Sequence, residues 1–274
     1  MLPAAFCIDL EKKKCYDVYC GMLQKYFRQC RKTLLFRWDW GIIMPNDMNA
    51  ANERNIKTHG RLIVLDGLDG SGKSTQFELL AKRLSEAPLK AISFPDYDKP
   101  SSALVRMYLA GEFSEDANAV NAYAASSFYA VDRYASYKLY WEREYLSGVT
   151  VLASRYVSSN AIHQMTKLDE REWDGYLAWL EDYEYVKLGL PRPDSVLLLD
   201  MPVEISQRLL SKRYGGDETK KDIHESNTDY LHRCRRAALY AADKLGWTVI
   251  RCCDGDEPLS VDAIADMIYN EVKA

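Results

Sequence analysis

The sequence predicts an α/β domain in which a parallel sheet is flanked by helices. From Arg61 onward, short apolar runs that suit buried strands alternate with longer segments in which apolar residues recur at helical spacing. This alternation is typical of parallel strands joined by helical crossovers. In chain order we expect strand 61–65, helix 75–86, strand 91–94, helices 101–110 and 118–147, strand 149–153, helix 169–187, strand 195–200, helices 202–212 and 226–245, strand 247–251 and helix 258–272.

Composition indicates a soluble protein whose ligands are small and acidic. Hydrophobic residues make up 47% and charged residues 28% of the 274 positions, as in ordinary globular proteins. The longest apolar runs fall far short of the roughly 18 residues of a membrane-spanning helix, so we expect no membrane association. The formal charge is −4, from 36 Lys and Arg against 40 Asp and Glu, and we therefore expect no nucleic-acid partner.

Cysteine usage indicates a reducing, cytoplasmic location. The chain has seven cysteines, an odd number, and Cys252 is adjacent to Cys253, which is unlike a disulfide framework. The N-terminus lacks the apolar core and cleavage pattern of a signal peptide. The four cysteines before residue 31 lack the paired spacing of common zinc modules.

Residues 1–58 are expected to form an N-terminal extension that is peripheral or disordered, ahead of one domain at 59–274. The extension holds ten Lys or Arg against six Asp or Glu, and it shows no strand, turn and helix order that would join it to the domain. Two interpretations stay open. The segment is either a targeting or partner-binding arm, or an accessory extension that includes upstream translated sequence before Met44 or Met48.

A glycine-rich turn follows the first expected strand. Residues 67–74, Gly-Leu-Asp-Gly-Ser-Gly-Lys-Ser, match the pattern G-x-x-x-x-G-K-[ST] in full, between a strand and a helix. In such a turn backbone N–H groups surround phosphate oxygens, the lysine reaches the β and γ phosphates, and the hydroxyl after it holds Mg²⁺. We therefore expect ATP to be bound by Gly67, Asp69, Gly70, Ser71, Gly72, Lys73, Ser74 and Thr75, with Ser74 as the magnesium ligand.

Accompanying motifs narrow the class of nucleotide-binding protein. The N-K-x-D motif by which GTPases read their base is absent, and so is the signature serine-glycine loop of transport ATPases. A small kinase remains.

Four further stretches indicate which kinase. They are FPDY at 94–97, FYAVDRY at 128–134, SRYVSSNAIHQ at 154–164 and GLPRPDSVLLLD at 189–200. With the glycine turn they resemble, in order and spacing, the thymidylate kinase family over about residues 61–272. Ala122-Tyr-Ala-Ala-Ser126 is similar to the PYAAS of clostridial-type members. The resemblance implies a P-loop kinase three-layer fold with a five-stranded parallel sheet and a short lid.

The resemblance also implies which residues form the nucleotide pocket. Phe94 and Pro95 would shape it, and Tyr129 would stack on the thymine ring. Arg133, four residues later on the same helical face, would reach the base or its phosphate. The alternatives are core packing for Tyr129 and a solvated Asp132–Arg133 pair.

A second group implied by the resemblance holds the sugar, phosphate and base edge. Arg155 follows the third expected strand, where open α/β sheets bind ligands, and its planar fork suits two phosphate oxygens; a plain surface arginine is the alternative. Asp69 would accept from the 3′-hydroxyl of the deoxyribose. Ser159 and Asn160 would read the edge of thymine.

Two positions depart from the family pattern. His163, followed by Gln164, stands where relatives usually have Tyr-Gln near the sugar, which makes the preference for deoxyribose less secure. Ser154 stands where most relatives have Asp beside the magnesium site. Because serine adds no charge, we expect weaker magnesium affinity or slower transfer than in relatives with Asp.

The segment 211–225 resembles the mobile lid of these kinases. It combines basic residues with two glycines, and Arg213, ahead of Lys212, would supply the cation that stabilises the transition state. Asp222 and Glu225 would help to order the lid. An ordinary solvated run of charges is the alternative.

Together these residues predict direct in-line transfer of the γ-phosphoryl group from ATP to dTMP, with Lys73, Arg155 and Arg213 as the catalytic residues and Mg²⁺ as cofactor. A homodimer is implied by the resemblance, and the long apolar helical segment 118–147 is compatible with an interface. Two other readings stay open: a kinase for another nucleoside monophosphate or a deoxynucleoside, and a weakly active nucleotide-binding protein because of Ser154.

Overall fold

The structure is a computed structural model that describes residues 59–114, 119–213 and 228–273. The predicted N-terminal extension, 1–58, lies outside the described residues, and so do residues 214–225 of the predicted lid, 211–225. The expectations for these two segments therefore stay predictions. The described residues belong to one compact unit.

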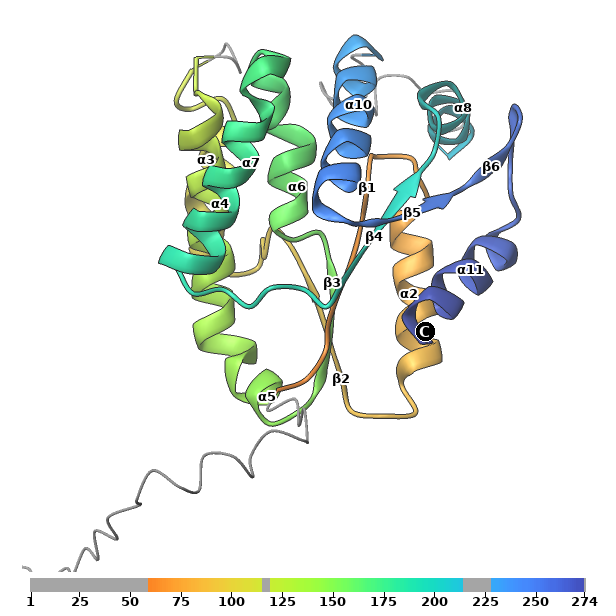
Figure 1. Ribbon diagram of the computed structural model, residues 1–274, viewed down its shortest axis with the longest axis horizontal. Coiled ribbons are helices and arrows are strands. Elements are labelled where there is room, and N and C mark those ends of the chain that lie inside the picture. Colours follow the sequence, from red (N-terminus) through yellow and green to blue (C-terminus); the bar gives the residue numbers. More distant parts are fainter. Residues whose placement is uncertain (1–58, 115–118, 214–227, 274) are drawn as a thin grey trace, which may run out of the picture. The chain divides into compact units, whose positions relative to one another are not determined.

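The sheet has five parallel strands in the order β2-β3-β1-β4-β5 (Figure 1). This confirms the predicted fold class, and every expected strand is present within about two residues of its predicted bounds. The strands are β1 (Leu62–Gly67), β2 (Leu89–Ser93), β3 (Thr150–Ser154), β4 (Ser195–Asp200) and β5 (Thr248–Arg251). Because β1 lies between β3 and β4, the loops that follow β1 and β3 leave the same edge of the sheet side by side.

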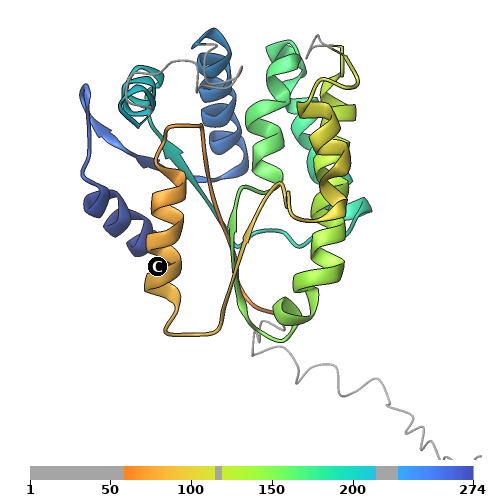
Figure 2. The ribbon, with the colours of Figure 1, turned by 180° about the vertical axis from the view of Figure 1, so that it is seen from behind.

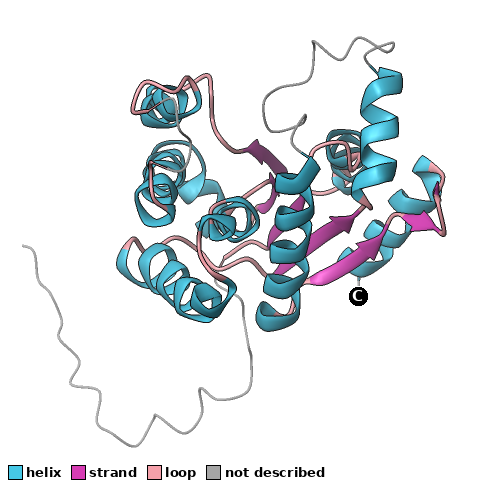
Figure 3. Cartoon of the chain, turned by 90° about the horizontal axis from the view of Figure 1, so that it is seen from above, coloured by secondary structure: helices cyan, strands magenta, loops and turns pink. Residues whose placement is uncertain are grey.

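Helices cover both faces of the sheet, as the view from above shows (Figure 3). Alternate residues of the central strand explain why: Leu62 and Val64 pack into the apolar core on one face, and Ile63 and Leu65 into the core on the other. Seen from behind, α2 and α11 lie side by side (Figure 2). The face with α2 (Lys73–Leu84) also holds α8 (Val203–Arg213) and α11 (Val261–Lys273), and the other holds α4 (Ala122–Ser136), α5 (Glu142–Leu146), α6 (Val157–His163), α7 (Trp173–Glu181) and α10 (Thr228–Leu245).

Several elements differ from the prediction. The expected helix 118–147 is α4, the π-helical segment η3 (Tyr137–Trp141) and α5 in succession, and the expected helix 169–187 likewise ends in the π-helical segment η6 (Asp182–Lys187). Helix α6 was not expected.

The remaining elements are short. Helix α3 (Ala103–Leu109) and the 3₁₀ turn η2 (Pro100–Ser102) share the expected helix 101–110, and the turns η4 (Met165–Lys167) and η5 (Glu170–Glu172) precede α7. Strands β6 (Cys253–Asp254) and β7 (Glu257–Pro258) form a small antiparallel pair that was also not expected. Within the described ranges, no helix is both long and apolar enough to cross a membrane.

Two glycines provide a matched test of the packing at the start of the sheet. A Cβ atom added to Gly60, just before β1, would lie 1.8 Å from the carbonyl oxygen of Val149, whereas one added to Gly175 in α7 would meet nothing within 4 Å. Gly60→Ala should lower the free energy of unfolding by about 2 kcal/mol or more, because backbone must move. Gly175→Ala should raise it by about 0.5–1 kcal/mol, because alanine favours a helix interior. Chemical denaturation would measure both, and equal stabilities would contradict the packing described.

Candidate active site

The glycine turn and the segment after β3 meet at the carboxyl edge of the sheet. Leu65 of β1 is in register with Ser154, the last residue of β3, so the chain leaves both strands at the same level. In open parallel sheets ligands bind at this edge, next to the strand from which the chain crosses to both sides. The site is therefore built from backbone positions that the sheet order brings together.

The glycine turn adopts a conformation that needs glycine at two positions. Gly70 has a φ of 76° and Gly72 a φ of 84°, both in the left-handed region. A Cβ atom at Gly70 would lie 2.9 Å from the carbonyl oxygen of Ser206 and 3.0 Å from Cγ of Leu210. A Cβ atom added to Gly72 would have no other heavy atom within 4 Å, so the backbone there is open to a ligand. This agrees with the predicted phosphate cradle.

Lys73 is the first residue of α2 and lies in the turn. Its Nζ donates to the carbonyl oxygen of Gly67 at 2.9 Å and lies 4.0 Å from Oδ1 of Asp69. Burial, reinforced by the positive charge of Arg155, lowers the pKa of Lys73 to about 8. The ammonium is therefore cationic at neutral pH but close to its titration range.

Three hydroxyl-bearing residues flank this lysine in the sequence. Ser74 and Thr75 are exposed in the first turn of α2, while Ser71 is buried and its Oγ has no hydrogen-bond partner among the described residues. The N-terminus of α2 adds the favourable end of a helix dipole. These groups fit a bound polyphosphate, and the exposed Ser74 hydroxyl fits a magnesium ion that takes its other ligands from phosphate and water.

No group of three His, Cys, Asp or Glu side chains within the described ranges is placed to hold a metal ion alone.

Arg155 follows β3 directly and is held by three contacts. Its φ of 66° is the only left-handed value of a residue other than glycine in the described parts of the chain. Its backbone N–H donates to Leu65 O at 3.0 Å, and its Nη2 donates to Oδ1 of Asp69 at 2.6 Å. Strain of this kind costs about 1–2 kcal/mol and points to a function when it is retained.

His163 at the end of α6 makes the third contact. Its Nε2 lies 3.0 Å from Nη1 of Arg155, and because a guanidinium can only donate, Nε2 must accept. Burial, together with the positive charge of Arg155, lowers the pKa of His163 to about 4, so the ring is neutral. Nδ1 then carries the hydrogen and faces the Tyr230 hydroxyl at 3.4 Å and Sγ of Cys234 at 3.7 Å.

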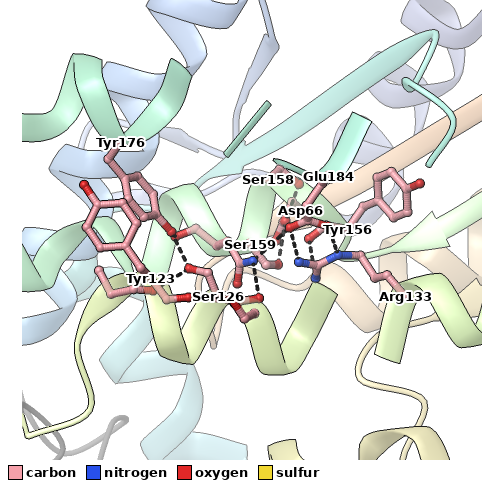
Figure 4. Close-up of polar contacts among 12 residues, drawn as sticks. Asp66, Tyr123, Ser126, Arg133, Tyr156, Ser158, Ser159, Tyr176 and Glu184 are labelled. Carbon is pink, nitrogen blue, oxygen red and sulfur yellow. Dashed lines mark hydrogen bonds and ion pairs between the residues drawn. The ribbon is translucent and has the colours of Figure 1, made fainter. Parts of the chain in front are cut away.

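Asp66 is a site residue that the sequence analysis missed. It lies in β1, is fully buried, and accepts hydrogen bonds from Ser158 Oγ and Ser159 Oγ, both at 2.7 Å, and from the Gly67 N–H at 2.8 Å (Figure 4). Asp66 therefore anchors the start of α6 to the glycine turn. Ser159, which we expected to read the base, is turned toward this carboxylate instead.

The residues expected around the base lie on α4 and after β2. Phe94 is buried, and its ring centroid lies 6.0 Å from that of Tyr156; the Phe94–Pro95 peptide is cis. Tyr129 meets Tyr108 edge to face, with ring centroids 6.4 Å apart, and burial raises the pKa of its hydroxyl. Tyr129 is partly buried, and its stacking on the thymine ring stays a prediction.

The pair Asp132–Arg133 is not solvated, which corrects that alternative. Both side chains are 1% exposed and they have separate partners. Asp132 accepts from the Asp96 N–H at 2.9 Å, which ties α4 to the loop after β2. Arg133 makes a bidentate ion pair with Glu184, with N–O distances of 2.7 and 2.5 Å (Figure 4). The expectation that Arg133 reaches the base or its phosphate stays a prediction.

Other predicted residues have mixed outcomes. Asn160 and Gln164 are buried, and Oε1 of Gln164 has no hydrogen-bond partner among the described residues. Arg213 is the last residue of α8, but its side chain lies outside what the structure describes, so its catalytic role stays a prediction.

Comparison with known proteins agrees with this geometry. The family model described as thymidylate kinase matches residues 65–257, which include the glycine turn, Arg155 and α6. The chain belongs to the thymidylate kinase family. It is therefore a phosphotransferase with the P-loop kinase fold, as the sequence predicted.

Individual relatives support the assignment. The thymidylate kinase of Mycobacterium tuberculosis is 30% identical over 185 residues, which cover 66% of this chain and 84% of that protein. The thymidylate kinase of Arabidopsis thaliana is 31% identical over 226 residues, covering 81% of this chain and 75% of that protein. A solved thymidylate kinase structure from Candida albicans shares the fold, with a TM-score of 0.57 over 78% of this chain and 92% of that one at 19% identity.

The lowered pKa of Lys73 predicts how nucleotide binding depends on pH. Below about pH 8 the side chain is cationic and can pair with the phosphates of ATP, and above it the proton is lost in the free enzyme. The dissociation constant for ATP should therefore rise about tenfold between pH 7 and pH 9. Calorimetry across this range would measure it. Lys73→Met should bind weakly at every pH, and an unchanged wild-type affinity would show that the lysine is not titrating.

Proposed function

We propose that this chain phosphorylates dTMP to dTDP with ATP by direct in-line transfer of the γ-phosphoryl group. The observation that carries the proposal is the 2.6 Å contact between Arg155 and Asp69, which joins the arginine after β3 to the glycine turn. A donor phosphate held by the turn and an acceptor phosphate held by Arg155 would lie end to end. Positioning and charge then supply the catalysis, since the acceptor is already anionic and needs no strong base.

The donor half uses the backbone of the turn and one cation. In the proposal, N–H groups from Gly70 to Ser74 surround the β and γ phosphates, and Lys73 follows the charge that moves during transfer. Mg²⁺ held by Ser74 would neutralise the phosphate oxygens and fix their geometry. Arg213, from the end of α8, would supply a further cation.

The acceptor half uses three regions of the chain. Arg155 would bind the dTMP phosphate through its planar fork, with His163 and Asp69 holding the guanidinium in place. Tyr129 would stack on the base, while Phe94 and Pro95 would close the pocket beside it. A nucleoside without a phosphate would leave Arg155 unused, which favours a monophosphate as acceptor.

A homodimer is part of the proposal. Apolar side chains are exposed in succession along α4, η3 and α5, and a second copy of the chain could cover them: Val131, Tyr134, Leu139, Tyr140 and Leu146. Leu139 is the most open of them, at 70% exposed.

The activity can be tested with ADP release as readout and dTMP, dUMP and thymidine as acceptors. Arg155→Ala should lower kcat/KM for dTMP about 100-fold or more, because it removes charge-assisted bonds that contribute roughly 1.5–3 kcal/mol each. Arg155→Lys should lower kcat/KM less than Arg155→Ala does, since the planar guanidinium is lost but the positive charge remains. Arg171→Ala, at a side chain 89% exposed, is the matched control. Preference for thymidine, or no ADP release with dTMP, would refute the proposed reaction.

Ser154 gives a prediction about metal affinity. It ends β3 directly before Arg155 and has no charge to offer a metal or its waters. Ser154→Asp should tighten the binding of Mg²⁺ in the presence of ATP and raise turnover, by about threefold to tenfold if one carboxylate hydrogen bond is gained. A titration of activity against Mg²⁺ measures both effects. If neither Mg²⁺ affinity nor turnover changes, Ser154 does not limit the rate of this enzyme. The hypothesis of a weakly active nucleotide-binding protein then loses its basis.

A further inference from the structure

A buried polar cluster joins three helical segments beside the expected base pocket. Arg133 comes from α4, Asn160 from α6 and Glu184 from η6, and their exposed fractions are 1%, 2% and 0%. An unpaired charge at such depth would be strongly destabilising, so these groups must satisfy one another. Glu184 is the member that contacts both of the others.

Glu184 occupies the hydrogen-bond donors on one edge of the Arg133 guanidinium. Its oxygens accept from Nε at 2.7 Å and from Nη2 at 2.5 Å, while Nη1 donates to the Tyr156 carbonyl oxygen at 3.2 Å. A guanidinium has five N–H groups, so donors remain on Nη1 and Nη2. Because the carboxylate cancels the charge of Arg133, its remaining donors suit a neutral carbonyl better than a phosphate. The proposed cation for the phosphate is Arg155.

Glu184 also fixes the orientation of the Asn160 amide. Nδ2 donates to Oε1 of Glu184 at 3.0 Å and to the carbonyl oxygen of Ser126 at 3.2 Å. Both partners are acceptors only, so the nitrogen and not the oxygen must face them. The remaining polar atom of Asn160 is Oδ1, which is an acceptor.

We propose that Glu184 is a positioning residue that determines base specificity, because it makes Arg133 present donors and Asn160 present an acceptor to the base of the monophosphate. Thymine and uracil match this pattern with the carbonyl O4 and the N3–H group. Cytosine has the opposite pattern, an amino group at C4 and an N3 without hydrogen. The inference rests on the proposed function, in which this base lies beside Tyr129.

The backbone around Glu184 supports a specific placement. The residue lies in η6, a π-helical stretch that follows α7, and its carbonyl oxygen accepts from the Leu190 N–H at 3.0 Å. Single π turns are rare and occur often at functional sites, where they change the direction in which a side chain points. An uninterrupted α-helix would shift every side chain after α7 to another angle around the helix axis.

Replacing the carboxylate by an amide would remove this control. In Glu184→Gln the side-chain nitrogen can donate to Oδ1 of Asn160, so only the Ser126 carbonyl oxygen, at 3.2 Å, still favours the original orientation of the Asn160 amide. Arg133 would also lose its counter-charge. The preference for dTMP over dCMP should therefore fall.

The experiment compares binding of dTMP, dUMP and dCMP to the full chain by calorimetry, alongside steady-state kinetics. The wild type should bind dTMP and dUMP at least about tenfold more tightly than dCMP, and Glu184→Gln should reduce this ratio about tenfold or more, with ATP affinity unchanged. Glu181→Gln is the matched control. It makes the same change one turn earlier, in the ion pair of Glu181 with Arg192 at 2.7 Å, and should retain the wild-type ratio.

A purely structural role for Glu184 gives a different result. Thermal stability would then fall while the affinities for dTMP and dCMP decline in parallel, and this unchanged affinity ratio would overturn the inference. A wild-type protein that does not prefer dTMP over dCMP would also overturn it. If Glu184→Gln does not fold, Glu184→Asp is the deciding variant, because it keeps the negative charge but moves the carboxylate away from its partners. An unchanged ratio of dTMP to dCMP affinity in that variant also overturns the inference. Failure of the proposed function is separate, since it appears as wild-type binding of both nucleotides without ADP release.

Discussion

The ion pair between Arg155 and Asp69 is the interaction on which the site depends. It joins two loops that leave adjacent parallel strands, and it can form only because β3 is next to β1 in the sheet. Arg155 reaches Asp69 from a left-handed backbone conformation, and a neutral His163 accepts from its other terminal nitrogen. The guanidinium is thus oriented by the fold itself, which reduces the loss of side-chain entropy when a phosphate binds.

Burial makes each of these polar contacts specific. Asp66 and the Arg133–Glu184 pair are almost completely buried, so an unmatched partner would leave a buried polar group unsatisfied. Asp66 ties α6 to the glycine turn through two serines, and Glu184 ties η6 to α4 and α6. The helices on this face are therefore positioned by hydrogen bonds as well as by the apolar core.

Local signals explain which parts the sequence could predict. The strands are short apolar runs, and the glycine turn has a backbone geometry that only a fixed pattern of glycines allows, so both are visible in a few consecutive residues. Asp66 and Glu184 are different, because their partners lie 92 or 93 and 51 residues away in the chain and nothing nearby marks them. The π turns were missed because one extra residue per turn hardly alters an apolar pattern, and α6 because it is only seven residues long.

The charges at the carboxyl edge of the sheet have a further consequence. The site holds two carboxyl side chains, Asp66 and Asp69, and two basic ones, Lys73 and Arg155, so the formal charges of these four groups sum to zero before any nucleotide arrives. A preformed neutral arrangement is stable on its own, but it has no surplus positive charge to offset two polyanionic ligands. The compensating cations must therefore come with the ligands or from another part of the chain, and the donor and acceptor would otherwise repel each other inside the site.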